Sequence, residues 1–347
     1  MSSTDEALFQ FIDIERLEVP NAEELINRDH LTDLFNRISR EAYLASDTII
    51  KLYLCATYNK FSIITRLKNK TEDVCYIIYD AYLVRVFREL NALYFFEDST
   101  SSDVWKMSYR LTAEREKLRR NDTLASYAIL NCYALGESDT KCEQDSSEND
   151  FFCHIQEFYI LAHEIGHARL MNYGSEKPTH DMQEALASIF SYWVDNSLDA
   201  DEVSLSRRAE EEISNNKSIT EECICDAFAI MCVLKYVESD FSKTTDKKML
   251  AFEAVYVCLM HIQLLSMHEL GPLDVEELEI TNSIRNQFFF DYVLGTLAPN
   301  EKPVFEKMIA ACAEKYDQQI LEEFLDALIT LEGRLVNLSE SVVECSM

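Results

Sequence analysis

Apolar residues recur at helical spacing along most of this chain, and this pattern predicts a mainly α-helical protein. The spacing predicts helices over 22–44, 47–58 and 72–94 in the first third of the chain. Further helices are expected over 180–197, 201–215, 219–238, 244–268, 274–294, 302–316 and 317–338. Six glycines and five prolines are too few for the turns of many short strands, so we expect at most a small β-sheet near the active site.

A few segments depart from the helical pattern. Residues 123–135 are short, rich in aromatic and apolar side chains and closed by Gly136, which favours a β-strand, with a helix as the alternative. Polar residues predict loops over 97–103 and 136–150, and residues 177–180 predict a turn that leaves His180 in a loop. We therefore expect an N-terminal helical lobe over 1–120 and a second domain over 121–347.

One expected helix, over 151–170, carries the sequence His-Glu-Ile-Gly-His at 163–167. Asn149 or Asp150 can cap its start, and Gly174 can end it. Two histidines four residues apart on a helix point the same way and can bind one metal ion. The segment therefore predicts half of a zinc site.

The glutamate inside this motif fits the same interpretation. With His163 and His167 as metal ligands, the Glu164 carboxylate can reach a zinc-bound water and take its proton. A third ligand must come from elsewhere, and the segment 220–229 is the best source because Glu222 and Asp226 share one helical face. Glu222 is then the ligand, while Asp226 accepts the free ring N–H of a liganding histidine.

Other acids are alternatives for the third ligand: Glu221, Asp226 and Glu184. Glu221 also has a structural role available, because the string 218–221 can form a capping box at the start of its helix.

The arrangement resembles the gluzincin class of zinc metallopeptidases, in which an HExxH helix is followed by a helix that bears a glutamate ligand in an ExxxD pattern. His163, Glu164 and His167 match the first half, and Glu222 and Asp226 match the second. The resemblance covers about residues 150–240 and implies a zincin-like peptidase domain. Within the class, the chain looks most like intracellular bacterial and phage-related metallopeptidases, including the phage-exclusion protease family that cleaves a host translation elongation factor.

The resemblance also implies roles for two residues further along the chain. Related enzymes often place a histidine and an arginine downstream of the third ligand, which draws attention to His268 and Arg285. His268 is the first candidate to donate to the carbonyl oxygen as it gains negative charge, with Arg285 as a helper. The usual His-Pro pair of the family is absent. The alternative for His268 is a histidine stabilised by the dipole at a helix C-terminus.

The remaining histidines and cysteines near the motif favour packing roles. His154 lies on another face of the motif helix, and His261 lies on an apolar run. Cys223 and Cys225 are two apart on a helix, so their side chains diverge, and we interpret them as packing residues. The aromatic stripe from Tyr76 to Phe96 is likewise expected in the core.

Charge and targeting signals narrow the function classes. The formal charge of −30, from 62 acidic and 32 basic residues, repels phosphate backbones and anionic membranes, so we expect no nucleic-acid or membrane partner. An acidic surface can bind a basic partner or simply keep a helical exterior soluble. Eleven cysteines without a CxxC pair suit reduced thiols, and the chain start lacks a signal-peptide pattern. No apolar run reaches the roughly 18 residues of a membrane span. These features predict a cytoplasmic protein, and they leave its oligomeric state open.

The resulting hypothesis is a zinc-dependent endopeptidase that hydrolyses peptide bonds in a cytosolic protein or peptide substrate. His163, His167 and Glu222 hold Zn²⁺ in an open site, and Glu164 activates the zinc-bound water. The alternative is a zinc-stabilised helical interaction protein without catalytic activity, whose site is closed by a fourth side chain. A third hypothesis treats the motif as accidental in a metal-free helical scaffold.

Overall fold

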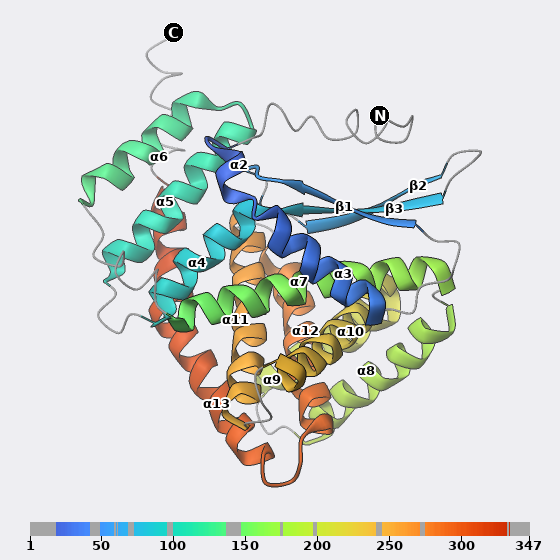
Figure 1. The fold of residues 1–347 in the computed structure, drawn as a ribbon. Coiled ribbons are helices and arrows are strands. Elements are labelled where there is room, and N and C mark those ends of the chain that lie inside the picture. The colour runs from blue at the N-terminus through green and yellow to red at the C-terminus, as the bar shows by residue number, and fades with distance from the viewer. Residues whose placement is uncertain are drawn as a thin grey trace.

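The computed structural model of this protein is mainly helical, as the sequence pattern predicts (Figure 1). It describes residues 19–41, 49–58, 60, 62–68, 73–95, 100–136, 147–173, 176–196, 200–240, 245–270, 275–331 and 333. The N-terminal half of this range contributes helices α2 (Ala22–Leu25), α3 (Arg28–Glu41), α4 (Ala81–Phe95), α5 (Ser101–Leu118), α6 (Asp122–Ala134) and α7 (Ser147–Tyr173). The C-terminal half contributes α8 (Glu176–Asn196), α9 (Ala200–Asn215), α10 (Lys217–Asp240), α11 (Thr245–Leu270), α12 (Val275–Thr296) and α13 (Lys302–Tyr316). A π-helical turn, η3 (Asp317–Leu321), follows α13.

Three strands form a small mixed sheet in the order β1-β3-β2. The central strand β3 (Asp73–Asp80) pairs in parallel with β1 (Ile49–Cys55) and antiparallel with β2 (Ser62–Lys68). The register places Ile49 opposite Val74 and Ser62 opposite Tyr79. Residues 74–80 of β3 are buried, so both faces of the central strand are covered.

This sheet corrects the expectation that residues 1–120 are helical throughout. The helix expected over 47–58 is instead β1, and the helix expected over 72–94 is β3 followed directly by α4. A strand that is buried on both faces is apolar at nearly every position, so its sequence lacks the alternation that marks a half-buried strand. Helical spacing was wrongly inferred from that continuous apolar run.

The strand expected over 123–135 is also wrong, because these residues form α6. The Asn121 side chain accepts a hydrogen bond from the backbone N–H of Leu124 and so caps the helix. α6 packs along α5 as a helical hairpin and leaves Leu130 and Tyr133 exposed. Apolar residues on the solvent side of a helix obscure its periodicity, and this explains the error.

The helices after the motif lie close to their expected positions, since α8 to α13 begin and end within a few residues of the predictions. His180 is an exception, because it lies inside α8 and not in a loop. The expected helix over 22–44 is divided into α2 and α3 at residues 26–27. Gly174 and residues 137–146 lie outside the described residues, and α7 ends at Tyr173.

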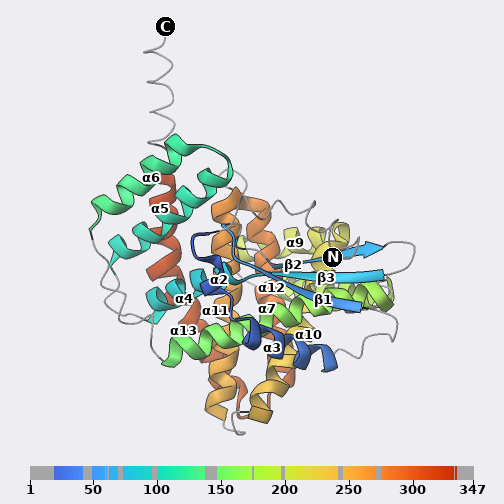
Figure 2. The same cartoon turned by 45° about the horizontal axis from the view of Figure 1, so that its top comes forward.

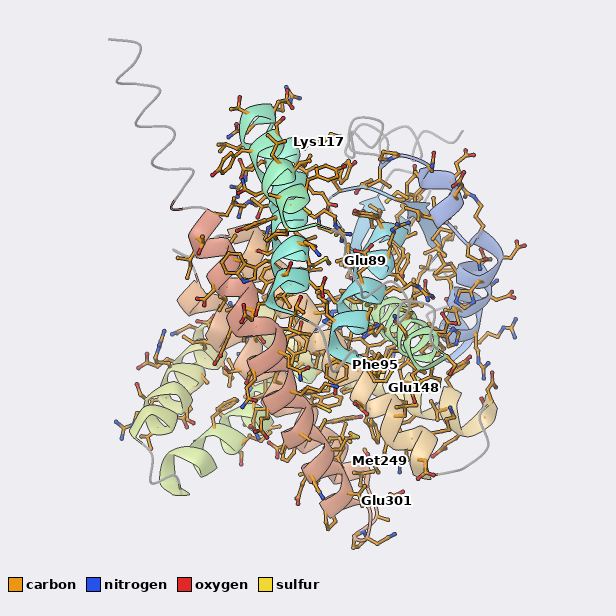
Figure 3. The ribbon with its side chains drawn as sticks, turned by 90° about the vertical axis from the view of Figure 1, so that its left-hand side faces the viewer. Glu89, Phe95, Lys117, Glu148, Met249 and Glu301 are labelled. Carbon is orange, nitrogen blue, oxygen red and sulfur yellow. The ribbon has the colours of Figure 1, made fainter. Side chains whose placement is uncertain are left out.

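Helix α7 lies at the centre of the molecule. It contacts α3, α4, α10 and α11, and the sheet lies over it through β2 and β3 (Figures 1 and 2). The end of α4 near Phe95 meets the start of α7 near Glu148 (Figure 3), where the rings of Phe95 and Phe152 are 4.7 Å apart. The main apolar core draws residues from both sides of position 120. The motif helix is therefore held on several sides by packed elements.

One helix in the described part of the chain, over Asp246–Glu269, is long and apolar enough to cross a membrane by composition, with a mean hydropathy of 1.6. The sequence pattern, by contrast, predicts no membrane span. In the structure, 72% of this apolar stretch is buried inside the protein, as in the core helix of a folded domain.

Candidate metal centre

Two helices supply the three side chains of the candidate site. α7 carries His163 and His167, and α10 carries Glu222. These helices pack closely because Gly166 has no side chain: a Cβ atom there would lie 3.0 Å from Cα of Cys225. The glycine inside the motif thus allows α10 to approach α7 near enough for its glutamate to reach both histidines.

The three side chains converge on one point. Nε2 of His163 lies 3.1 Å from Nε2 of His167. The Glu222 carboxylate spans the pair, with Oε2 at 3.1 Å from His163 Nε2 and Oε1 at 3.2 Å from His167 Nε2. Two imidazole nitrogens and the two oxygens of one carboxylate thus lie close together.

The spacing of these ligand atoms fits a zinc ion. Zinc–nitrogen and zinc–oxygen bonds of about 2.0–2.1 Å in tetrahedral geometry separate neighbouring ligand atoms by about 3.3–3.4 Å. The observed separations of 3.1 and 3.2 Å need only a small expansion to reach that value. A set of two histidines and one carboxylate is also a donor set typical of catalytic zinc sites.

Asp226 fixes the orientation of the His163 ring through a contact with its Nδ1 atom. Its Oδ1 atom lies 2.8 Å from Nδ1 of His163, which directs Nε2 of the same ring towards Glu222. Asp226 is itself held by Tyr159, whose hydroxyl donates at 2.6 Å, and by Arg285 of α12, whose Nε and Nη2 donate at 2.8 and 2.7 Å. Both residues expected to support the site, Asp226 and Arg285, are therefore brought to it.

The charges of the site are strongly coupled. Burial lowers the pKa of His163, but the carboxylates of Asp226 and Glu222 outweigh burial and raise this pKa to about 10. Burial raises the pKa of Glu222, but hydrogen bonds from His163 and His167 outweigh it and hold the pKa well below its usual range. Both shifts reflect ionised carboxylates around a positive charge, which in the metal-free protein is the protonated His163 ring. A metal ion bound here would take the place of that proton.

Glu164 is buried beside the ligands, and burial raises its pKa above the ordinary value of a glutamate. It borders a cavity of about 290 Å³ that also reaches His163, Glu222 and Arg285. The rest of the cavity wall consists of Lys60, Leu83, Tyr159, Ile160, Ile262, Leu265, Ser266 and Glu269. A carboxylate that can accept a proton thus lies next to His163 and Glu222, and it borders a cavity with space for a ligand.

Three residues of this site were missed in the sequence. Tyr159 lies one helical turn before His163, and this spacing could have revealed it. Gly166 could have been recognised as a point of close helix contact. Lys60 could not, because it lies in the connection between two strands that were not expected. Its φ of 53° is left-handed, and its ammonium donates to Glu114 at 3.1 Å.

His268 is not brought to the cavity wall. It is 1% exposed, its Nε2 lies 3.1 Å from the Thr112 hydroxyl, and its ring meets Phe324 edge-on at 5.9 Å. Burial and the nearby cationic side chains, Arg115 first among them, lower the pKa of His268 well below its usual value. Its neighbours Ser266 and Glu269 line the cavity instead. These contacts describe a packed core histidine.

The other acids considered for the third ligand lie differently from Glu222. Glu184 is on α8, where its side chain is 71% exposed and pairs with His180 at 3.4 Å. Asp226 contacts Nδ1 of His163 and not the Nε2 atom that faces Glu222. Glu221 is half-buried on α10 and is not among the residues lining the cavity.

The packing predictions for His261, for Cys223 and Cys225 and for the aromatic stripe agree with the structure. His261 is fully buried and bonded to Tyr316 and Asn91 at 2.9 Å each. Cys223 and Cys225 are buried, and the cysteines in the described part of the chain are free thiols. The described residues of the stripe from Tyr76 to Phe95 are mostly buried, as expected.

Comparison of the chain with models of protein families, with curated proteins and with solved structures gave no match. The function must therefore be inferred from the geometry of the site.

Proposed function

We propose that this protein is a zinc-dependent endopeptidase that hydrolyses peptide bonds in a cytoplasmic protein or peptide substrate. The observation that carries the proposal is the convergence of His163, His167 and Glu222 beside the buried carboxylate of Glu164, at the wall of a cavity. Zinc bound to these residues would polarise the scissile carbonyl and acidify water at neutral pH.

Each residue around His163, His167 and Glu222 has a role in this proposal. Glu164 accepts the proton of the attacking water and later returns it to the leaving amine. Asp226 keeps His163 in the tautomer that presents Nε2 to the metal. Arg285, held on Asp226 with its Nη1 at 3.7 Å from Glu222 Oε2, contributes positive charge at the cavity wall as oxygen gains negative charge.

The alternative, a purely structural zinc site in an interaction protein, needs a fourth protein ligand. Among the described residues, the group of side chains that could share one ion here consists of His163, His167 and Glu222. The adjoining cavity leaves space next to them. An open coordination position beside a general base favours catalysis over a structural role.

The test combines zinc content with cleavage. Zinc per chain is measured by mass spectrometry on protein purified without metal-affinity resin, and cleavage is followed in a library of proteome-derived peptides. The Glu164→Gln variant is expected to keep zinc at this site and to lose cleavage by about 100-fold or more. The His163→Ala and Glu222→Ala variants are expected to lose both the zinc of this site and cleavage.

The controls separate chemistry from folding. Helical content by circular dichroism should be the same in Glu164→Gln and the natural chain, because the substitution preserves size. Cleavage at the natural rate by Glu164→Gln would refute the proposed mechanism. Zinc retained in full without any cleavage in the natural chain would favour the interaction protein.

A further inference from the structure

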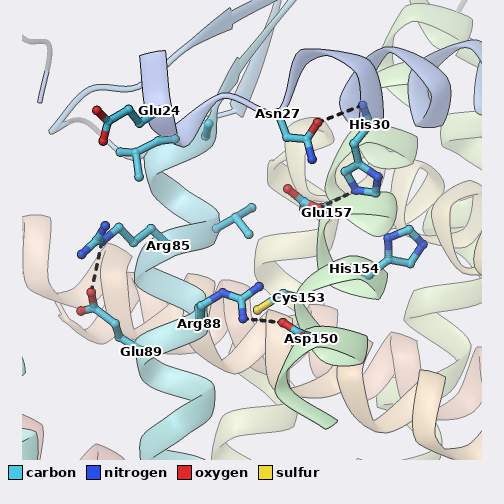
Figure 4. Close-up of a pocket in the computed structure, with 13 residues that line it drawn as sticks. Glu24, Asn27, His30, Arg85, Arg88, Glu89, Asp150, Cys153, His154 and Glu157 are labelled. Atoms are coloured by element: carbon cyan, nitrogen blue, oxygen red, sulfur yellow. Dashed lines mark hydrogen bonds and ion pairs between the residues drawn. The ribbon is translucent and has the colours of Figure 1, made fainter. Parts of the chain in front are cut away.

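A second group of metal-binding side chains lies at the other end of the same helix. His154 and Glu157 are three residues apart on α7, and His30 of α3 faces them (Figure 4). With a rise of about 1.5 Å per residue, His154 lies about 13 Å along the helix from His163, too far to share an ion with it. The two groups are separate sites.

The three potential ligand atoms lie within 4.8 Å of one another. Nε2 of His30 and Oε2 of Glu157 are already 3.0 Å apart, close to the edge of a tetrahedral zinc site. The rings of His30 and His154 have centroids 5.1 Å apart. Each of the three side chains therefore offers one ligand atom to a common space.

Tyr236 of α10 supports this arrangement by holding the far side of the His154 ring. Its hydroxyl lies 2.6 Å from Nε2 of His154, and this contact leaves Nδ1 as the nitrogen available for a metal. A metal-bound histidine commonly donates its second ring N–H to a neighbouring oxygen. The guanidinium of Arg37 stacks over the Tyr236 ring at 4.4 Å and helps to fix it.

The surrounding cavity, of about 520 Å³, favours a cation over an anion. Its wall contains four carboxylates, from Glu24, Glu89, Asp150 and Glu157, and two guanidiniums, from Arg85 and Arg88. Both guanidiniums pair with carboxylates of the same wall, Arg85 with Glu89 and Arg88 with Asp150 (Figure 4). The cavity also provides an entry path and space for water to complete the coordination.

We propose that His30, His154 and Glu157 form a second divalent-metal site, for zinc or a similar transition metal, that ties α3 to the N-terminal half of α7. Imidazole and carboxylate ligands suit zinc, cobalt and nickel better than magnesium or calcium. The contact between His30 and Glu157 is, without metal, a hydrogen-bonded pair between the two helices. A metal ion replaces this single contact by three bonds and fastens α3 to the helix that carries the first site.

The test is the number of zinc ions per chain after equilibrium dialysis against zinc, measured by mass spectrometry. Expected values are two for the natural chain and one for His30→Gln, for Glu157→Gln and for His163→Ala. The double variant His30→Gln/His163→Ala should bind none. His180→Gln is the matched control, because His180 also pairs with a glutamate but lies on an exposed surface, and it should bind two.

Gln at position 30 can still hydrogen-bond to Glu157, so a loss of zinc is not a consequence of a broken helix contact. Equal helical content in every variant confirms that the chain is folded. The proposal is overturned if His30→Gln and Glu157→Gln bind as much zinc as the natural chain, or if His180→Gln loses as much as they do. Because the readout is zinc and not cleavage, the second site stands or falls independently of the peptidase proposal.

Discussion

Oδ1 of Asp226 lies 2.8 Å from Nδ1 of His163, and this contact joins α10 to the face of α7 that carries the candidate ligands. Asp226 is 1% exposed, and its carboxylate also accepts hydrogen bonds from the Tyr159 hydroxyl and from two guanidinium nitrogens of Arg285. A buried carboxylate with this many donors stays ionised, and hydrogen bonds of this kind orient a histidine before a metal arrives. The orientation of His163 thus depends on a residue outside the candidate metal-binding group.

The first prediction follows from this contact. Asp226→Asn should weaken zinc binding at the first site by about 10- to 100-fold, because the ring of His163 loses its anionic partner. It should also destabilise the metal-free protein by about 3 kcal/mol, because Arg285 is left buried without its main counter-charge. Zinc affinity is measured by competition with a chromogenic chelator, and stability by urea unfolding in the presence of a chelator.

A double variant separates these two effects. Asp226→Asn/Arg285→Met removes the unpaired charge and should recover much of the stability lost in Asp226→Asn, while zinc binding stays weak. If zinc affinity recovers together with stability, Asp226 acts only as a counter-charge for Arg285. If Asp226→Asn binds zinc as tightly as the natural chain, the orienting role is wrong.

The parts of the site that could be predicted are those that depend only on the spacing of residues along one helix. His163, Glu164 and His167 lie within one and a half turns of a helix, and Glu222 and Asp226 lie one turn apart on another. Helical geometry alone places His163 and His167 on one face of α7, and Glu222 and Asp226 on one face of α10. The packing of α10 against α7 is a tertiary contact. The four-residue spacing of Glu222 and Asp226 was nevertheless enough to predict it.

The features that local spacing could not predict depend on contacts between distant segments. β3 becomes a strand because β1 and β2 pair with it on either side, and its own sequence does not reveal these partners. His268 was interpreted through a family resemblance, but its position depends on how α11 packs against Thr112 of α5. Lys60 reaches the cavity only because the sheet exists.

The second prediction concerns the contact between the two ligand-bearing helices. Gly166→Ala places a methyl group 3.0 Å from Cα of Cys225, and a backbone atom cannot move aside as a side chain can. The expected cost is about 1–3 kcal/mol, larger than the gain in helix propensity of about 1 kcal/mol. Because α10 must shift away from α7, zinc affinity at the first site should fall as well.

Gly295→Ala is the matched control, because Gly295 is exposed near the end of α12 and a Cβ there meets nothing within 4 Å. This substitution should stabilise the protein by about 0.5 kcal/mol and leave zinc binding unchanged. Urea unfolding and chelator competition on both variants give the comparison. A Gly166→Ala protein with natural stability and zinc affinity would show that the helix contact does not control the site.

The third prediction uses a buried histidine that belongs to neither proposed metal site. Burial lowers the pKa of His261 to about 3 in the folded protein, against the ordinary value of 6.5. As the pH falls below 6.5, the unfolded chain therefore binds a proton that the folded protein cannot accept. The stability contributed by the neutral ring is complete above pH 6.5 and is lost progressively as the pH falls towards 3.

His261→Gln removes this titration. One proton taken up only by the unfolded state lowers the free energy of unfolding by up to about 1.4 kcal/mol per pH unit. Between pH 6 and pH 5 the natural chain should thus lose about 1 kcal/mol more than His261→Gln, whatever the variant costs at pH 7. Urea unfolding of metal-free protein at both values measures the difference, with His180→Gln, altered at an exposed histidine, as the control. Parallel losses in the natural chain and His261→Gln would mean that His261 is protonated inside the fold, and that its bonds to Tyr316 and Asn91 accommodate the charge.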